Sequence, residues 1–538
     1  MKKTFYIQLI VTMLLALCSC DKWLDLTPTD RLSDKIIWEN EESVNKYVNG
    51  FYTYIHQYGQ FGGAQSRGNL TESLTDAFKY GSYVLGDLAG FPNQYVITPE
   101  VISPTNCFYD NWADGYNKIR RLNQFLDEMS KYSTLSAEKN KLIESQVKFF
   151  RAFIYFHLAK RHGGVLLYTS LDEINKNKAL SSEEETWDLI QSDLDFAADN
   201  LPNEWSSVSD KGRVTKHVAY ALQSRAMLYA QRWQKAYDAA TEVINSSKYS
   251  LVDNYANSWK GNNSESILEF KYEQSGPNHT FDRNYVPISD GWDFGGRGTP
   301  TQEMVECYEK ADGTKINWNL YHVTNATRPP YESLEPRFKA TIIYPGSTWK
   351  NKVMQNSVGS INGSFMEYRS QPNIYGYTTT GYYLRKLLDE NLIDISGTPS
   401  TQTWVEIRYA EVLLNKAEAA YRLNKIGEAQ NLMNQVRTRV NLPGKTSTGD
   451  QWFKDYRNER KVELAFEGHL FWDMRRWKLA HIEYHNYRTH GFKIIGDNYE
   501  YIDVDKEDRK FLQRTYILPI PAAELENNSL ITQYEGWL

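Results

Sequence analysis

The chain has 538 residues, with 61 Lys or Arg and 67 Asp or Glu, so its formal net charge is −6. This length allows one large domain or two to three ordinary ones, with a sizeable core. The negative balance and the lack of a basic cluster argue against nucleic acid as the main partner. Four cysteines in so long a chain do not make a disulfide framework.

The first 22 residues have the pattern of a secretory signal. Lys2 and Lys3 precede a mostly apolar run over residues 5–17, and a small residue and Cys20 follow. A cysteine directly after a small residue is typical of a bacterial lipoprotein, so we expect cleavage before Cys20 and lipidation of its thiol. The alternative is an uncleaved anchor, but the run is shorter than the roughly 20 apolar residues that cross a bilayer.

This signal divides the chain into three expected parts. We predict a signal peptide over 1–19, a lipid-anchored arm over 20–42 and a single domain over 43–538. Only Cys107 and Cys307 then remain as unmodified cysteines in the mature chain, and nothing in the sequence requires them to pair.

Apolar residues recur at helical spacing in four segments of the first half of the chain. Glycines at 163–164 and a proline at 202 follow two of these segments and are typical of helix ends. The predicted helices are 43–58, 111–132, 137–161 and 186–200.

Two further segments, 216–246 and 407–440, each predict a pair of antiparallel helices. Small residues recur in both with spacings of 12 and then 7 positions, which lets two helices approach closely. A tetratricopeptide-type hairpin requires such a close approach of its two helices, and an unrelated helix pair is the alternative. The small residues are Ser224, Ala236 and Val243 in the first pair and Ala417, Ala429 and Val436 in the second.

The rest of the chain lacks this periodicity. Residues 59–104 and 250–400 are rich in Gly, Asn, Pro and aromatic residues, with short predicted strands near 267–270 and 340–344. We therefore predict a mainly α fold, in which a tetratricopeptide-like scaffold of helical hairpins carries large irregular, loop-rich insertions.

No catalytic signature is present: the sequence has no HExxH, GxSxG, P-loop or Rossmann motif. The acidic run of Asp503, Asp505, Glu507 and Asp508 could hold a structural calcium ion. It lacks EF-hand spacing, so a solvated loop is the favoured interpretation. We expect no other cofactor and no catalytic metal.

Three glutamates, Glu459, Glu463 and Glu467, are spaced four apart on a helix predicted over 455–481. A glycosidase needs two carboxylates across a cleft, usually from different elements. Three on one helical face instead favour a structural ion-pair network, and Arg460 and Arg475 are near in sequence.

The same segment carries a recognisable motif, RNERKVELAFEGH at 457–469 followed by FWDMRRW at 471–477. It closely resembles the C-terminal signature of the SusD/RagB family of outer-membrane nutrient-binding lipoproteins. The chain end, LPIPAAEL at 518–525, and the lipoprotein signal resemble that family as well.

This resemblance implies a lipid-anchored, mostly helical protein with four tetratricopeptide-like units and an irregular ligand-binding half. It also implies a place on the cell surface at the outer membrane, beside a SusC-like TonB-dependent transporter. Family members bind glycans without cleaving them, so we expect glycan capture and no enzyme activity.

Aromatic residues make up 14% of the chain, and exposed rings on loops are suited to stacking on sugar faces. Core packing is the alternative role for each ring. Two segments combine aromatic and polar residues in this way, 80–95 and 285–321. The candidate glycan contacts are Tyr80, Tyr83, Asp87 and Phe91 in the first and Trp292, Phe294, Arg297, Trp318 and Tyr321 in the second.

Two other functions remain open from the sequence. One is a surface glycoside hydrolase, which would need a carboxylate pair in a cleft. The other is an adaptor whose helical hairpins bind peptides or glycoproteins.

Overall fold

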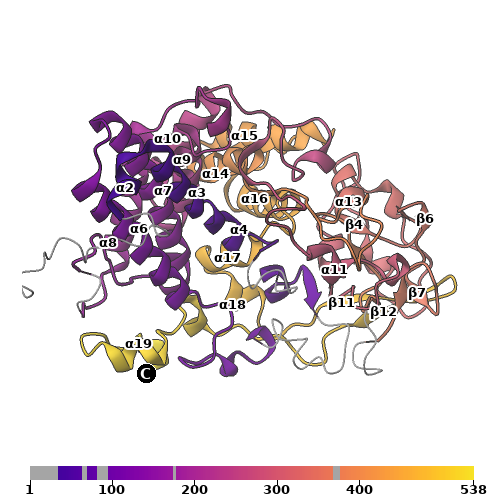
Figure 1. Ribbon diagram of the computed structural model, residues 1–538. Coiled ribbons are helices and arrows are strands. Elements are labelled where there is room, and N and C mark those ends of the chain that lie inside the picture. Colours follow the sequence, from indigo (N-terminus) through magenta and orange to yellow (C-terminus); the bar gives the residue numbers. More distant parts are fainter. Residues whose placement is uncertain (1–33, 63–69, 81–94, 174–176, 368–375) are drawn as a thin grey trace, which may run out of the picture.

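The computed structural model describes residues 34–62, 70–80, 95–173, 177–367 and 376–538. Within them, a bundle of long helices forms one side of the molecule, and irregular segments with short strands form the other (Figure 1). The mainly α fold is confirmed. In the part of the chain that is described, no helix is both long and apolar enough to cross a membrane.

The predicted helices are all present, with shifted boundaries. The segment 43–58 forms two helices instead of one. The fourth helix begins three residues early because Ser182 and Glu185 form a reciprocal capping box, with Glu185 N donating to Ser182 Oγ over 3.1 Å. The long helices are α3 (Glu41–Phe51), α6 (Trp112–Tyr132), α7 (Ala137–His162), α8 (Glu183–Asn200), α9 (Lys216–Tyr229), α10 (Trp233–Asn245), α14 (Tyr409–Arg422), α15 (Ile426–Arg439) and α16 (Gly449–Glu463), with the shorter α2 (Asp34–Glu39) and α4 (Thr53–Tyr58) at the start.

The predicted arm of residues 20–42 is only partly described, and its last part belongs to the folded body. Trp38 on α2 is buried, and its ring packs edge-on against Phe125 of α6 at a centroid distance of 4.9 Å. The folded domain therefore includes residues before the predicted boundary at 43. Cys20 and the predicted signal peptide lie outside the described residues.

Helix α7 is the central helix of the bundle. It packs against α6 and α8, and every residue from 149 to 159 is buried, so no face of this stretch is exposed. A helix that is apolar on every side must be enclosed by its neighbours. The buried phenylalanines are Phe149, Phe150, Phe153 and Phe156.

The two predicted hairpins are confirmed as α9–α10 and α14–α15, and α10 packs directly on α14. The small residues at their crossings are fully buried. Both hairpins turn in the same way, because Gln231 and Asn424 adopt the left-handed conformation (φ 56° and 60°). In each turn the next residue donates its N–H back to the helix that has just ended, Arg232 to Met227 O and Lys425 to Ala420 O.

The large insertion between α10 and α14 is closed at its base by two strands. Strand β2 (Ser266–Phe270) pairs antiparallel with β10 (Trp404–Arg408), immediately before α14 begins at Tyr409. The predicted strand at 267–270 is thus confirmed. At 340–344 only Ile342–Ile343 form a strand, because α13 (Pro336–Thr341) continues through the first two predicted positions.

All sheets of the described residues are two-stranded, so the irregular half has no extended sheet to organise it. Short helices and packed loops fill the space between the strand pairs. The pairs are β1 (Phe78–Tyr80) with β3 (Gly298–Pro300), β4 (Ile342–Ile343) with β9 (Tyr383–Leu384), β5 (Thr348–Trp349) with β6 (Lys352–Val353), β7 (Ser357–Val358) with β8 (Ser364–Phe365) and β11 (His490–Ile495) with β12 (Asn498–Asp503). The short helices are α11 (Phe281–Tyr285), α12 (Gln302–Val305), α17 (Leu470–Arg476), α18 (Ala480–Glu483) and α19 (Ala522–Asn527).

The single helix predicted over 455–481 is wrong. Helix α16 ends at Glu463, and α17 and α18 follow as separate helices. Between α16 and α17 the chain turns through Phe466 and Gly468, which both have positive φ (64° and 84°). A side chain at Gly468 would also meet the amide of Gln60 at 2.2 Å, so this turn requires glycine there.

The glutamates of this segment form a buried ion-pair network, which confirms the structural interpretation. Arg408 donates to Glu463 over 2.7 Å, to Glu467 over 2.8 Å and to Glu265 over 2.7 Å. Arg337, Arg437 and Arg439 add further ion pairs to Glu459 and Glu463.

The predicted partners of this network are different from the observed ones. Arg460 pairs with Asp473 over 2.6 Å, and Arg475 donates to backbone carbonyls of Thr515 and Tyr516. The observed partners Arg337 and Arg408 come from the insertion, far from α16 in the sequence, and Arg437 and Arg439 come from α15, the helix just before α16.

We predict that Arg408→Met lowers the free energy of unfolding by about 3–5 kcal/mol, because it leaves buried carboxylates without their central cation. Urea unfolding monitored by circular dichroism measures the change. The matched control is Arg488→Met, whose half-exposed pairs with Asp503 and Asp508 are screened by water, so this variant should lose much less stability. Equal losses for both variants would contradict the account.

Candidate ligand-binding site

The structure brings the two predicted glycan segments together. Strand β1 pairs with β3 so that Tyr80 lies opposite Gly298, and Gly298 directly follows Arg297. The first segment therefore starts beside the second. Tyr83, Asp87 and Phe91 lie outside the residues that the structure describes.

Trp292 and Phe294 form an aromatic pair on the loop that follows α11. Their ring centroids are 5.4 Å apart at an interplanar angle of 59°. Trp292 is half-buried, and its indole N–H donates to Arg283 O over 2.8 Å, which fixes the ring. Phe294 is 46% exposed, which is high for so large an apolar side chain on a packed loop.

Backbone hydrogen bonds hold this loop in shape. Gly296 N donates to Val286 O over 3.0 Å, and Arg297 N donates to Asn284 O over 2.8 Å. The side chain of Arg297 bonds back to Phe294 O through Nε over 3.2 Å. The loop therefore presents two rings and a guanidinium group from a defined backbone.

Two of the predicted glycan contacts have buried rings. Trp318 is 5% exposed and packs against Tyr331 and the half-buried Tyr321, with centroid distances of 6.4 and 6.0 Å. Tyr80 is likewise 5% exposed. Both side chains serve the core, where an enclosed ring offers no open face to a sugar.

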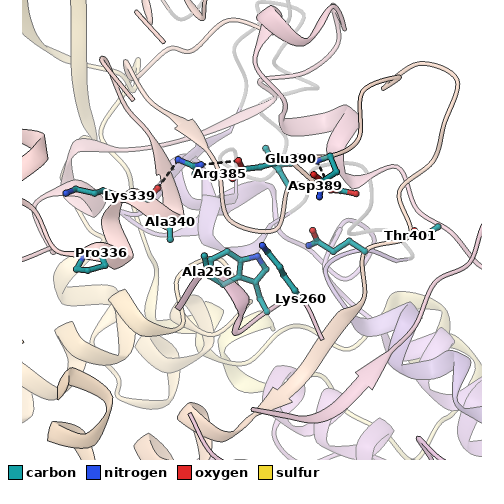
Figure 2. A pocket seen from close by; sticks show the side chains of 13 residues that line it. Ala256, Lys260, Pro336, Lys339, Ala340, Arg385, Asp389, Glu390 and Thr401 are labelled. Carbon is teal, nitrogen blue, oxygen red and sulfur yellow. Dashed lines mark hydrogen bonds and ion pairs between the residues drawn. The ribbon is translucent and has the colours of Figure 1, made fainter. Parts of the chain in front are cut away.

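A separate pocket of about 460 Å³ lies between the base of the insertion and α13 (Figure 2). Arg385 spans its rim, donating to Glu390 over 2.8 Å and to Lys339 O over 3.3 Å. Figure 2 shows Lys260, Asp389 and Thr401 around the same opening. The residues that line it are Ala256, Trp259, Lys260, Pro336, Lys339, Ala340, Arg385, Leu388, Asp389, Glu390, Asn391, Thr401 and Gln402.

This pocket offers polar groups and little ring surface. Trp259 is 5% exposed, the Lys386 ammonium lies 5.0 Å from its ring, and Tyr255 packs edge-on against it. Behind the rim, burial raises the pKa of Asp282 to about 7, and this carboxyl accepts the backbone N–H of Asp389. Sequence reasoning missed the pocket because four separate segments build it and none has a local signal.

The carboxylates of the ion-pair network are unsuited to glycosidase chemistry. Burial alone would raise the pKa of Glu467, but Arg408 and Lys386 lower it to about 2. A glycosidase acid needs a raised pKa so that it carries a proton near neutral pH. Glu467 instead stays ionised between two cations.

Carboxylates of the acidic run at 503–508 form ion pairs with neighbouring arginines. Asp505 is buried and pairs with Arg509 over 2.6 Å, and the Arg509 and Lys79 charges overcome burial to hold its pKa well below the ordinary range. Asp503 and Asp508 pair with Arg488. Among the described residues no group of three or more His, Cys, Asp or Glu side chains could hold a metal ion. Cys107 and Cys307 are both free thiols.

Comparison with known proteins shows which family has this fold. The model of the SusD family matches residues 241–537, and a second model, described as starch-binding associating with outer membrane, matches residues 22–228. The first match covers more than half of the chain, so the chain belongs to the SusD family.

Relatives and solved structures agree with this assignment over nearly the whole length. The chain is 23% identical to SusD-like protein P25 of Formosa agariphila, over 98% of this chain and 97% of the relative. The crystal structure of a SusD-like protein from Bacteroides fragilis superposes with a TM-score of 0.79 at 28% identity, covering 95% of this chain and all of that one. A SusD-like carbohydrate binding protein from the same species gives a TM-score of 0.76 at 22% identity, over 92% of this chain and all of that one, and shows the same fold.

Proposed function

We propose that this protein captures glycans without cleaving them, and that the Trp292–Phe294 loop is the main contact. The observation that carries the proposal is an aromatic pair, of which Phe294 is 46% exposed and Trp292 half-buried, on a loop fixed by backbone hydrogen bonds. Membership of the SusD family and the carbohydrate-binding description of one structural relative support it.

The chemistry of the loop suits a sugar. A pyranose ring has apolar C–H faces that stack on aromatic rings, and a rim of hydroxyl groups that need donors and acceptors. Phe294 supplies a ring that is 46% exposed, Trp292 adds a half-buried indole fixed by its hydrogen bond to Arg283, and the guanidinium group of Arg297 lies on the same loop. A ring that is already fixed loses little conformational freedom when it binds.

The pocket in Figure 2 is a second place where a hydroxyl-rich ligand could bind. Its volume lies within the range of small-ligand sites. The aromatic loop carries the proposal because Trp259 in that pocket is only 5% exposed, whereas Phe294 is 46% exposed.

Delivery to a SusC-like TonB-dependent transporter at the cell surface completes the proposal. Its support is the family membership, the outer-membrane wording of the second family model and the lipoprotein pattern that ends in Cys20. The lipid on Cys20 would hold the mature protein on the outer leaflet.

Two other functions have less support. A hydrolase would need a carboxylate pair with one raised pKa across a cleft, and the glutamates of α16 and the following turn do not provide it. A peptide-binding adaptor would use the helical hairpins, but the facing surfaces of α9, α10, α14 and α15 are packed against one another.

Affinity electrophoresis through gels that contain soluble starch or laminarin, together with a glycan array, tests glycan capture. We expect the mature protein to bind at least one glycan and to release no reducing sugar. Phe294→Ala should weaken binding about threefold to tenfold, the effect of losing one aromatic stacking contact.

The matched control for this test is Tyr132→Ala, which removes another ring that is 41% exposed, at the end of α6. It should leave retention unchanged, and both variants should keep the wild-type melting temperature. Equal retention of wild type and Phe294→Ala would assign binding elsewhere, and released sugar would favour the hydrolase.

Cys20→Ala tests the anchor. We expect the variant to leave the membrane fraction while the purified protein binds glycans as the wild type does, because only the lipid attachment is lost. Fractionation and metabolic labelling with a fatty-acid analogue give the readout. A processed, labelled and membrane-bound variant would contradict lipidation at Cys20.

A further inference from the structure

Three cations surround the buried ring of Trp472 on α17. The Lys160 ammonium lies 4.7 Å from the ring centroid, the Arg161 guanidinium 4.6 Å and the Arg475 guanidinium 5.3 Å. Within the described part of the chain, none of these three cations has a carboxylate within ion-pair distance.

The other hydrogen bonds of these arginines go to neutral carbonyl groups. Arg161 donates to Tyr109 O and to His157 O, each over 2.9 Å. Arg475 donates to Thr515 O and Tyr516 O, and its buried Nε has no partner among the described residues. Their positive charges therefore stay unbalanced.

The nearby carboxylates already have ion-pair or hydrogen-bond partners. Glu406 pairs with Arg225, and Glu467 pairs with Arg408 and Lys386. Asp110, whose charge also acts on Arg161, accepts from the His162 ring over 3.1 Å and from Trp112 N over 2.8 Å. In contrast to these cations, Arg151, Arg225, Arg337, Arg408 and Arg460 are buried arginines that each meet a carboxylate.

Two small adjoining cavities open beside these cations. Their volumes are about 50 and 90 Å³, and they share Lys160, Tyr229 and Trp472 as walls. Arg161 and His157 line the first cavity together with the paired carboxylates Glu406 and Glu467. His157 is 5% exposed, and neither of its ring nitrogens has a partner among the described residues. Arg475 and Lys478 line the second, where Glu183 is the single carboxylate.

Unbalanced buried charge is costly, typically several kcal/mol per ion. The same burial shifts the pKa values of these groups. Burial lowers the pKa of Arg161 to about 10, and it lowers the pKa of Lys160 and of His157 well below their ordinary values. A protein that keeps several cations here without an internal counter-charge is suited to receive one from solution.

We propose that these cavities form a binding site for a small oxyanion of the sulfate or phosphate type, held by Lys160, Arg161 and Arg475 at the junction of α7 and α17. Arg161 lines the first cavity and Arg475 the second, and each guanidinium group keeps N–H donors of the fork geometry that such oxygens accept. The volumes take one tetrahedral group and are too small for a sugar ring.

The position of the site gives the bound anion a structural role. Lys160 and Arg161 belong to the end of α7, whereas Arg475 belongs to α17 and bonds to the chain at 515–516. An anion between them would join the helical bundle to the C-terminal part of the chain. The site is independent of the aromatic loop, so glycan capture does not depend on it.

Isothermal titration calorimetry of the purified mature protein tests the site, with sodium phosphate, sulfate and chloride at equal ionic strength. We expect saturable binding of phosphate or sulfate at millimolar concentrations or below, much weaker chloride binding, and a rise in melting temperature that saturates in parallel. Saturation separates this rise from the general stabilisation by sulfate, which keeps growing with concentration. Glucose 6-phosphate as a fourth ligand shows whether the group arrives free or attached to a sugar.

Lys160→Met should weaken anion binding at least about tenfold, and in anion-free buffer this variant should melt at or above the wild-type temperature because one uncompensated charge is gone. The matched control, Lys141→Met, changes an exposed lysine on the same helix and should bind as the wild type does. Absence of saturable oxyanion binding, equal binding of chloride, or unchanged binding by Lys160→Met would overturn the proposal.

Discussion

The rest of the structure depends on the buried ion pairs of Arg408. It is the last residue of β10, at the base of the insertion, and it directly precedes α14. Its guanidinium group reaches Glu265 from the insertion and Glu463 and Glu467 from the end of α16 and the turn after it. Because all these groups are buried, none can leave without stranding a charge away from water. The irregular half is thereby tied to the helical scaffold by buried ion pairs.

This rigid connection explains how loops without a sheet can still present a binding surface. The strands of the irregular half occur only in pairs among the described residues, so the loops depend on their own hydrogen bonds and on the scaffold behind them. The loop of Trp292 and Phe294 is held by bonds to Val286 and Asn284, close to α11. The cation cluster around Trp472 is the opposite case, because its cations have no carboxylate partner among the described residues, and we propose that an anion takes that place.

The sequence predicts those features that local spacing determines. The hairpins at 216–246 and 407–440 follow from small residues at matching offsets, and the structure buries every one of them. The family resemblance follows from a contiguous motif and is confirmed by the family models. The ion-pair role of Glu463 also follows from spacing, but its partners do not, since Arg337 and Arg408 come from segments far away in the chain.

Features that depend on tertiary packing could not be predicted from the sequence. Phe466 adopts a positive φ that its residue type disfavours, so the end of α16 has no local signal. Trp318 and Phe294 are both aromatic residues in one loop-rich segment, yet one is enclosed by Tyr331 and the other is open to solvent. The pocket in Figure 2 is built from four segments, none of which is distinctive alone.

The central claim is that a preformed loop on the irregular half takes the glycan while the helical scaffold stays unchanged. Hydrogen–deuterium exchange of the mature protein, with and without the glycan that the gels and the array identify, tests it most directly. The account predicts added protection over residues 286–298 and none in α9, α10, α14 or α15. Protection concentrated in those hairpins, with residues 286–298 unaffected, would contradict it.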